Sequence, residues 1–223
     1  KSYFGPGSDC LFMLDHETGE RREGTIKDVK DISRVSDALP NIDFLMSGCV
    51  PSDVSSENAN HRQMYEMIVN STKPIMFVTN DYESSVDVVK AAELIAGGEE
   101  AHRKKPYSCC YINVTDPLKH NAESLQKLLL LSGKGFPTTY TPMVLRGANG
   151  PVTSAGAVAL ANAGELVGLV LAQLNNEGAP IIHGGGYDDV FDMRFMCDVY
   201  TGPESYGTRL AMAKHYGLPI FGL

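Results

Sequence analysis

The sequence lacks an excess of basic residues, and this excludes the charge pattern typical of nucleic-acid-binding proteins. Among 223 residues, 27 Asp and Glu outnumber 19 Lys and Arg, which gives a formal net charge of −8. Association of such a chain with a polyanionic backbone is unfavourable because both partners are negatively charged. The sequence also lacks an N-terminal signal pattern and a basic juxtamembrane cluster. We therefore expect neither nucleic acid nor membrane among its partners.

The sequence also lacks a cysteine pattern that would indicate disulfides or a zinc ribbon. It has five cysteines, an odd number, and none is arranged as CxxC. They are Cys10, Cys49, Cys109, Cys110 and Cys197. Reduced thiols and a cytoplasmic location are predicted on this basis. No second histidine is spaced for zinc near His183, so no metal site is predicted.

Several catalytic signatures are missing as well. The segment Ser47–Pro51, which follows the first predicted strand, does not read GxGxxG, so a dinucleotide-binding Rossmann fold is disfavoured. The chain has no GxSxG nucleophile elbow, no HExxH motif and no Ser-His-Asp signature. Its 43% apolar and 21% charged residues are nevertheless typical of a folded globular protein.

The first forty residues predict a small N-terminal region, residues 1–40. His16–Glu20 is typical of a hairpin turn between two short strands. Thr25 is expected to cap a helix, with Asp28 three residues later completing a capping box. The apolar stripe predicted for this helix comprises Ile26, Val29, Ile32, Val35 and Leu39.

Residues 41–223 alternate between short apolar runs and helical patterns. Predicted strands cover 41–47, 74–79, 108–114, 138–145, 179–183 and the residues from 219; predicted helices cover 58–70, 84–96, 122–131, 154–174 and 204–216. Gly97, Gly133 and Gly217 are expected to end three of these helices. The alternation predicts parallel βα units. A doubly wound sheet and a (β/α)8 TIM barrel both fit it. With about six units, we expect an α/β domain that forms part of a barrel.

The predicted helix 154–174 is apolar and almost long enough to span a membrane. Asn162, Glu165 and Gln173 nevertheless fall on one face, with Ala, Val and Leu opposite. A helix docked tightly on a sheet through small residues explains this pattern better. Thr153 is expected to cap the helix, whose N-terminus would then offer an anion site.

Ligands of parallel α/β proteins bind at the C-terminal ends of the strands, which directs attention to the strand-to-helix loops. The loop 183–204 is much longer than the usual about 2–6 residues. His183 at its start is either a packed histidine or a polar group of the site. The run Gly184–Gly186 allows close approach of a bulky ligand, and weakly resembles a phosphate cradle. Tyrosines near strand ends, including Tyr111 and Tyr140, could surround a quaternary ammonium group.

Longer blocks of residues resemble the trimethylamine:corrinoid methyltransferase family, over essentially the whole chain. The blocks are Gly150–Ala157, Asn162–Leu166, Val170–Leu174, Gly178–Pro180, Asp192–Arg194 and His215–Pro219. This resemblance implies a TIM barrel of which the chain is a part. It also implies either a methanogen enzyme that carries pyrrolysine and acts on trimethylamine, or an enzyme without pyrrolysine that acts on glycine betaine or a related amine. The deciding position would follow a motif like Gly217–Gly222 and lies beyond Leu223.

The implied reaction moves a methyl group from a tertiary or quaternary amine to the Co(I) corrinoid of a separate protein. The enzyme would orient the methyl group and exclude water. Its expected partners are that corrinoid protein, a small methylated amine and further copies of itself in a homo-oligomer. The assigned residues are Asp192 and His183 as catalytic groups; Tyr111, Tyr140, Arg146 and Thr153 as substrate-binding groups; and Gly184, Gly185 and Gly186 as corrinoid-binding groups.

Two other classes remain open at this stage. One is a corrinoid-independent barrel lyase or transferase acting on a small acid, and the other is a non-catalytic amine-binding protein. The long loop places Asp188, Asp189 and Asp192 against the single cation of Arg194. This charge balance favours a cationic ligand over a free carboxylic acid.

Overall fold

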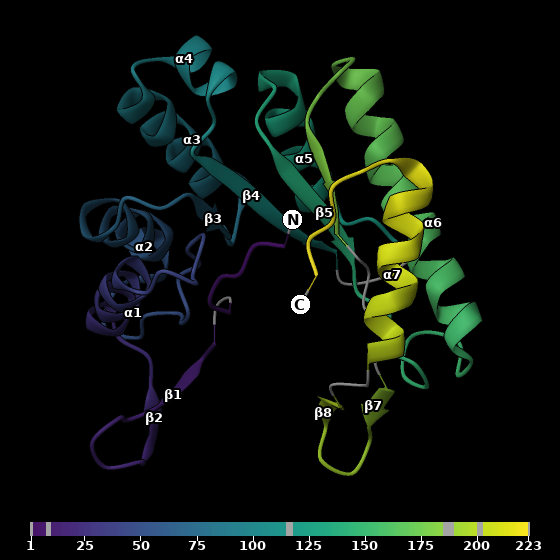
Figure 1. Cartoon of the computed structure of the whole chain (residues 1–223), viewed down its shortest axis with the longest axis horizontal. Coiled ribbons are helices and arrows are strands. Elements are labelled where there is room, and N and C mark those ends of the chain that lie inside the picture. Colours follow the sequence, from purple (N-terminus) through teal and green to yellow (C-terminus); the bar gives the residue numbers. More distant parts are fainter. Residues whose placement is uncertain (1, 8–9, 115–117, 185–189, 200–202, 223) are drawn as a thin grey trace. The chain divides into compact units, whose positions relative to one another are not determined.

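The computed structural model describes residues 2–7, 10–114, 118–184, 190–199 and 203–222 (Figure 1). The predicted site residues Gly185, Gly186, Asp188 and Asp189 lie outside the described residues. The chain forms two compact units, Lys1–Cys110 and Tyr111–Leu223. The predicted division at residue 40 remains a prediction.

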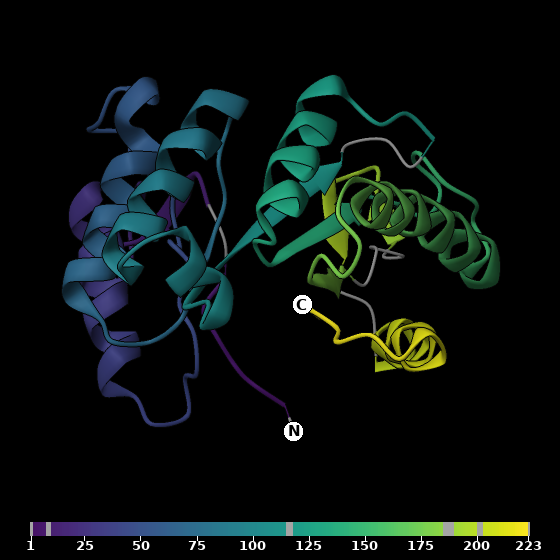
Figure 2. The ribbon, with the colours of Figure 1, turned by 90° about the horizontal axis from the view of Figure 1, so that it is seen from above.

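The first unit contains the predicted hairpin, followed by helices beside short strands. Its elements are β1 (Phe12–Leu14), β2 (Arg21–Glu23), α1 (Ile26–Ala38), α2 (Ser56–Asn70), β3 (Ile75–Phe77), α3 (Tyr82–Ala96) and α4 (Glu99–Lys104). Figure 2 shows α1, α2 and α3 side by side. The short helix α4 was not predicted. Gly97 ends α3 in the left-handed conformation, with φ 91°, as predicted.

The apolar stripe predicted for α1 is wrong at its C-terminal end. Val29 is buried, but Val35 and Leu39 are 59% and 47% exposed. Ser33 and Ser36 are buried instead, and the Ser33 hydroxyl donates to the Val29 carbonyl oxygen. That bond within the helix satisfies a buried polar group, so this serine can occupy a buried position outside the predicted stripe.

The second unit begins within a strand. Its elements are the end of β4 (Ser108–Val114), α5 (Ala122–Lys134), β5 (Thr138–Pro142), α6 (Ser154–Asn175), β6 (Ile181–His183), β7 (Val190–Asp192), β8 (Cys197–Val199) and α7 (Pro203–Tyr216). The prediction that Gly133 ends a helix is wrong, because α5 continues to Lys134 and Gly135, with φ 65°, ends it. The predicted long loop after β6 contains an antiparallel hairpin, β7–β8.

The sheet has four strands in the order β3-β4-β5-β6. The pairs β3–β4 and β5–β6 are parallel. The first and last predicted strands are each reduced to a single parallel bridge. These bridges are Leu45↔Ile75 and His183↔Ile220. The six predicted segments therefore follow one another in chain order, as sequential βα units do. The result is an α/β fold with a parallel sheet flanked by helices, which is compatible with part of a TIM-like barrel.

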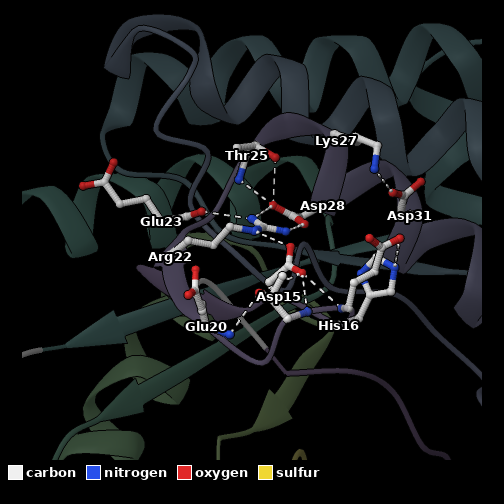
Figure 3. Close-up of polar contacts among 11 residues, drawn as sticks. Asp15, His16, Glu20, Arg22, Glu23, Thr25, Lys27, Asp28 and Asp31 are labelled. Carbon is white, nitrogen blue, oxygen red and sulfur yellow. Dashed lines mark hydrogen bonds and ion pairs between the residues drawn. The ribbon is translucent and has the colours of Figure 1, made fainter.

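An ionic cluster joins the β1–β2 hairpin to the start of α1 (Figure 3). The Arg22 guanidinium donates to both carboxylate oxygens of Asp28 at 2.7 Å and to Asp15 at 3.1 Å. Asp28 also accepts from the backbone N–H of Thr25 at 2.8 Å, as predicted for a capping box. The Arg22 side chain holds the pKa of Asp28 well below its usual range. Bonds from Thr18 N–H and then Arg22 lower the pKa of Asp15 to about 2.

We expect replacement of Arg22 by leucine to raise the pKa of Asp28 most, because Arg22 is the main cause of its depression. The pKa of Asp15 should rise less, because the bond from Thr18 N–H remains. NMR of the side-chain carboxyl carbons measures both changes. Since the folded-state pKa values of Asp15 and Asp28 are depressed, their stabilising contribution is present above pH about 4 and is lost as the pH falls towards 2. Arg22→Leu should weaken this pH dependence, mainly through Asp28. Lys27→Ala is the control, because Lys27 joins Asp31 in an exposed pair at 3.2 Å. Unchanged carboxyl pKa values in Arg22→Leu would contradict the cluster.

Helix α6 docks through small residues, but it turns its polar side inward. Its buried positions are Ala157, Ala161, Gly164, Glu165, Gly168 and Ala172. A Cβ atom at Gly168 would lie 2.3 Å from the Tyr140 ring, so only glycine permits this approach. Val170 and Leu174 are 53% and 79% exposed. By length and composition alone, α6 could cross a membrane, a test that core helices also pass.

Candidate functional site

The candidate site lies in the second unit, at the C-terminal ends of β5 and β6. Tyr140 and His183 are paired in the parallel register of these strands. The Tyr140 ring packs on Gly168 of α6, so Tyr140 and His183 point towards this helix. Side chains alternate along a strand, so Thr139 and Thr141 point to the opposite side, the face away from α6.

On the α6 side, His183 and Glu165 form a buried pair. Their side chains are 6% and 5% exposed, and Nε2 lies 2.7 Å from Oε2. The contact has the distance of an ion pair but not the direction of a well-aligned hydrogen bond. The His183 ring stacks on Tyr216 of α7, whose hydroxyl accepts from Asn162 Nδ2 at 2.9 Å. Glu165 and Asn162, two members of the predicted polar face of α6, therefore hold β6 and α7 in place.

The space beside the Glu165–His183 pair is small. Two cavities that include both residues in their linings have volumes of about 10 Å³ each, enough for about one water molecule. A methylated amine is larger than either cavity. This geometry fits a role in positioning β6 better than direct contact with substrate.

Tyr140 is also held by a histidine that sequence reasoning missed. His120 Nδ1 lies 2.7 Å from the Tyr140 hydroxyl, and the two rings are stacked with their planes 9° apart. Burial raises the pKa of Tyr140 to about 12, so its phenol remains protonated at neutral pH. His120 ends the strand-to-helix loop that follows β4, which was expected on the ligand face, but no motif singled out His120 within that loop.

The face away from α6 brings together two aromatic side chains. Met143 N–H donates to the Val114 carbonyl oxygen, and this register sets Tyr111 of β4 beside Thr139 of β5. The Tyr111 ring meets the Phe221 ring edge to face, with centroids 5.6 Å apart and planes at 62°. Tyr111, predicted to face a cation, thus lies on the side of the sheet opposite Tyr140 and His183.

Gly184 has a packing reason to be glycine. A Cβ atom there would lie 2.2 Å from Thr141 Oγ1 and 3.0 Å from the Tyr140 carbonyl oxygen. The protein's own β5 strand therefore fills the space that was predicted to admit a corrinoid. The other two glycines of this run, Gly185 and Gly186, lie outside the described residues.

Arg146 and Asp192 lie on neighbouring segments. The Arg146 carbonyl oxygen accepts from Phe191 N–H at 3.3 Å, which places the loop after β5 beside β7. The Arg146 side chain is half-buried, and within the described residues its Nε has no hydrogen-bond partner. Asp192 Oδ1 accepts from the backbone N–H groups of Arg194 at 2.7 Å and Phe195 at 3.4 Å, so this carboxylate also shapes the hairpin turn.

Thr153 caps α6 as predicted. Its hydroxyl accepts from Gly156 N–H at 3.3 Å, so this oxygen is already used by the helix. Among the residues that the structure describes, no group of three or more His, Cys, Asp or Glu side chains could hold a metal ion.

Comparison with known proteins shows to which family the chain belongs. The family model described as trimethylamine methyltransferase (MTTB) matches residues 1–221. The chain is 30% identical to a glycine betaine methyltransferase of Desulfitobacterium hafniense (strain Y51), over 96% of this chain and 45% of that protein. It is 31% identical to the trimethylamine methyltransferase MttB of Methanosarcina thermophila, over 87% of this chain and 41% of that protein. The chain thus spans less than half the length of these relatives, and over that length it belongs to the trimethylamine methyltransferase family.

Proposed function

We propose that the full-length protein transfers a methyl group from a methylated amine to the corrinoid of a partner protein, and that the amine is a betaine. The relatives supply the reaction class, since they are named for glycine betaine and trimethylamine. The observation that carries the choice of substrate is Arg146. It is a half-buried guanidinium whose Nε has no hydrogen-bond partner among the described residues, on the loop that follows β5. A guanidinium in this state suits a carboxylate, which it can bind through two parallel bonds.

The amine half of the reaction can be assigned to residues of this chain. The Tyr111 ring offers a negative π face to a quaternary ammonium group. Arg146 holds the carboxylate, and Asp192, on the segment beside Arg146, is assigned as the counter-charge of the ammonium group. A quaternary nitrogen leaves as a neutral amine without being protonated. The site therefore needs no general acid, consistent with His183 and Tyr140 pointing towards α6.

The corrinoid, when bound, supplies the nucleophile that accepts the methyl group. Gly184 offers it no open cradle, because Thr141 occupies that space. In this proposal His183 and Tyr140 are positioning residues for the strand ends. The same proposal includes a barrel completed by further chain, a homo-oligomer and a cytoplasmic location.

The test uses full-length protein, an active corrinoid partner protein, and either glycine betaine or trimethylamine. We expect the absorbance change of corrinoid methylation with glycine betaine, and formation of one dimethylglycine per methyl group transferred. Binding of glycine betaine without any transfer would support a non-catalytic amine-binding protein instead. Absence of both binding and transfer with either amine would overturn the proposed function.

A further inference from the structure

We propose that Phe221 and Tyr111 together form the aromatic wall that binds the methylated ammonium group, with Phe221 as an additional substrate-binding residue. This inference rests on the proposed function and deepens it. Sequence reasoning singled out Tyr111 but assigned no role to Phe221.

The Tyr111 and Phe221 rings meet edge to face. Their centroids are 5.6 Å apart and their planes meet at 62°, so the edge of one ring points at the other. An edge-to-face pair fixes both rings without stacking their π faces on each other. Tyr111 is buried, whereas Phe221 is half-buried and keeps part of its surface accessible. A cation within about 6 Å of such a ring centroid is attracted by the ring quadrupole.

Backbone hydrogen bonds to β6 hold Phe221 in place. Its backbone N–H donates to the His183 carbonyl oxygen at 2.9 Å, and His183 N–H donates to the Pro219 carbonyl oxygen at 2.8 Å. These two bonds fix the backbone on either side of Ile220, which bridges to β6. The His183 side chain is in turn paired with Glu165. The buried pair on the α6 side thus positions an aromatic ring on the other side of the sheet.

Phe221 reaches the face away from α6, where Thr139 and Thr141 are buried with hydroxyl groups that have no partner among the described residues. Buried hydroxyl groups are normally hydrogen-bonded, so such groups mark a place where a polar ligand or water completes the structure. Aromatic rings beside polar groups suit a ligand with a methylated cation and a polar remainder.

The experiment replaces Phe221 in the full-length protein by phenylalanines carrying one, two or three ring fluorines. Fluorine withdraws charge from the π face while leaving the ring almost the same size. Calorimetry should show that the dissociation constant of glycine betaine rises with each added fluorine, and that it is roughly tenfold higher for the trifluorinated ring. The affinity for 3,3-dimethylbutanoate, in which carbon replaces the charged nitrogen, should not depend on the number of fluorines in this way. The same fluorinated residues at Phe136, which is 2% exposed, are the control and should leave binding unchanged.

The outcomes separate this inference from the function on which it rests. Stepwise weakening at Phe221 alone supports the aromatic wall. If all the fluorinated Phe221 variants bind glycine betaine equally well and still transfer methyl groups, the role of Phe221 is overturned and the proposed function stands. Failure of the unmodified protein both to bind and to demethylate any methylated amine overturns the function and this inference with it.

Discussion

Replacing Glu165 by leucine should lower the free energy of unfolding by about 3 kcal/mol. The reason is that the variant leaves His183 buried opposite an apolar group, with its former partner removed. Chemical unfolding of the full-length protein, followed by circular dichroism, measures the loss.

The double variant Glu165→Leu/His183→Leu is the matched control. Buried ion pairs can often be exchanged for apolar residues of similar volume at little cost, so the second change should recover most of the loss. A double variant that loses as much as the sum of the two single variants would show that the residues do not act as a pair.

The second large effect concerns substrate choice. Arg146→Ala should reduce kcat/KM for glycine betaine by roughly 100-fold, because a desolvated charge pair is worth a few kcal/mol when one partner is removed. Turnover of trimethylamine, which has no carboxylate, should be almost unchanged. Steady-state rates of corrinoid methylation with each amine measure the difference.

Arg194→Ala provides a comparison at an exposed position of the β7–β8 hairpin. It removes the same charge without reaching the proposed carboxylate site, so both amines should react at nearly normal rates. Equal losses with glycine betaine and trimethylamine in Arg146→Ala would point to a structural role for Arg146 and remove the argument for a betaine.

Much of the secondary structure could be predicted from local chemistry. The capping residues Thr25 and Thr153 mark the starts of α1 and α6 correctly, because a cap depends on neighbours in the sequence. Strand β4 was predicted with its observed bounds, Ser108–Val114. Gly133 misled the prediction because a glycine can also lie inside a helix, and here Gly135 takes the left-handed conformation that ends α5.

The candidate site was harder to predict, since periodicity shows which residues share a face but not what that face contacts. The polar face of α6 was recognised, yet only the structure shows that Glu165 points inward to His183. Tyr111 and Tyr140 both appeared as aromatics near strand ends. Strand register then places them on opposite sides of the sheet. Phe221 and His120 acquire partners only through tertiary contacts.

The order of the strands has a consequence for how the protein is made. From Leu45 to Ile220, each parallel segment lies next to the segment synthesised just before it. Each addition therefore needs only a crossover of local length, which keeps the entropy of loop closure small. A chain leaving the ribosome at about 5–20 residues per second can therefore extend the sheet unit by unit from Leu45 to Ile220.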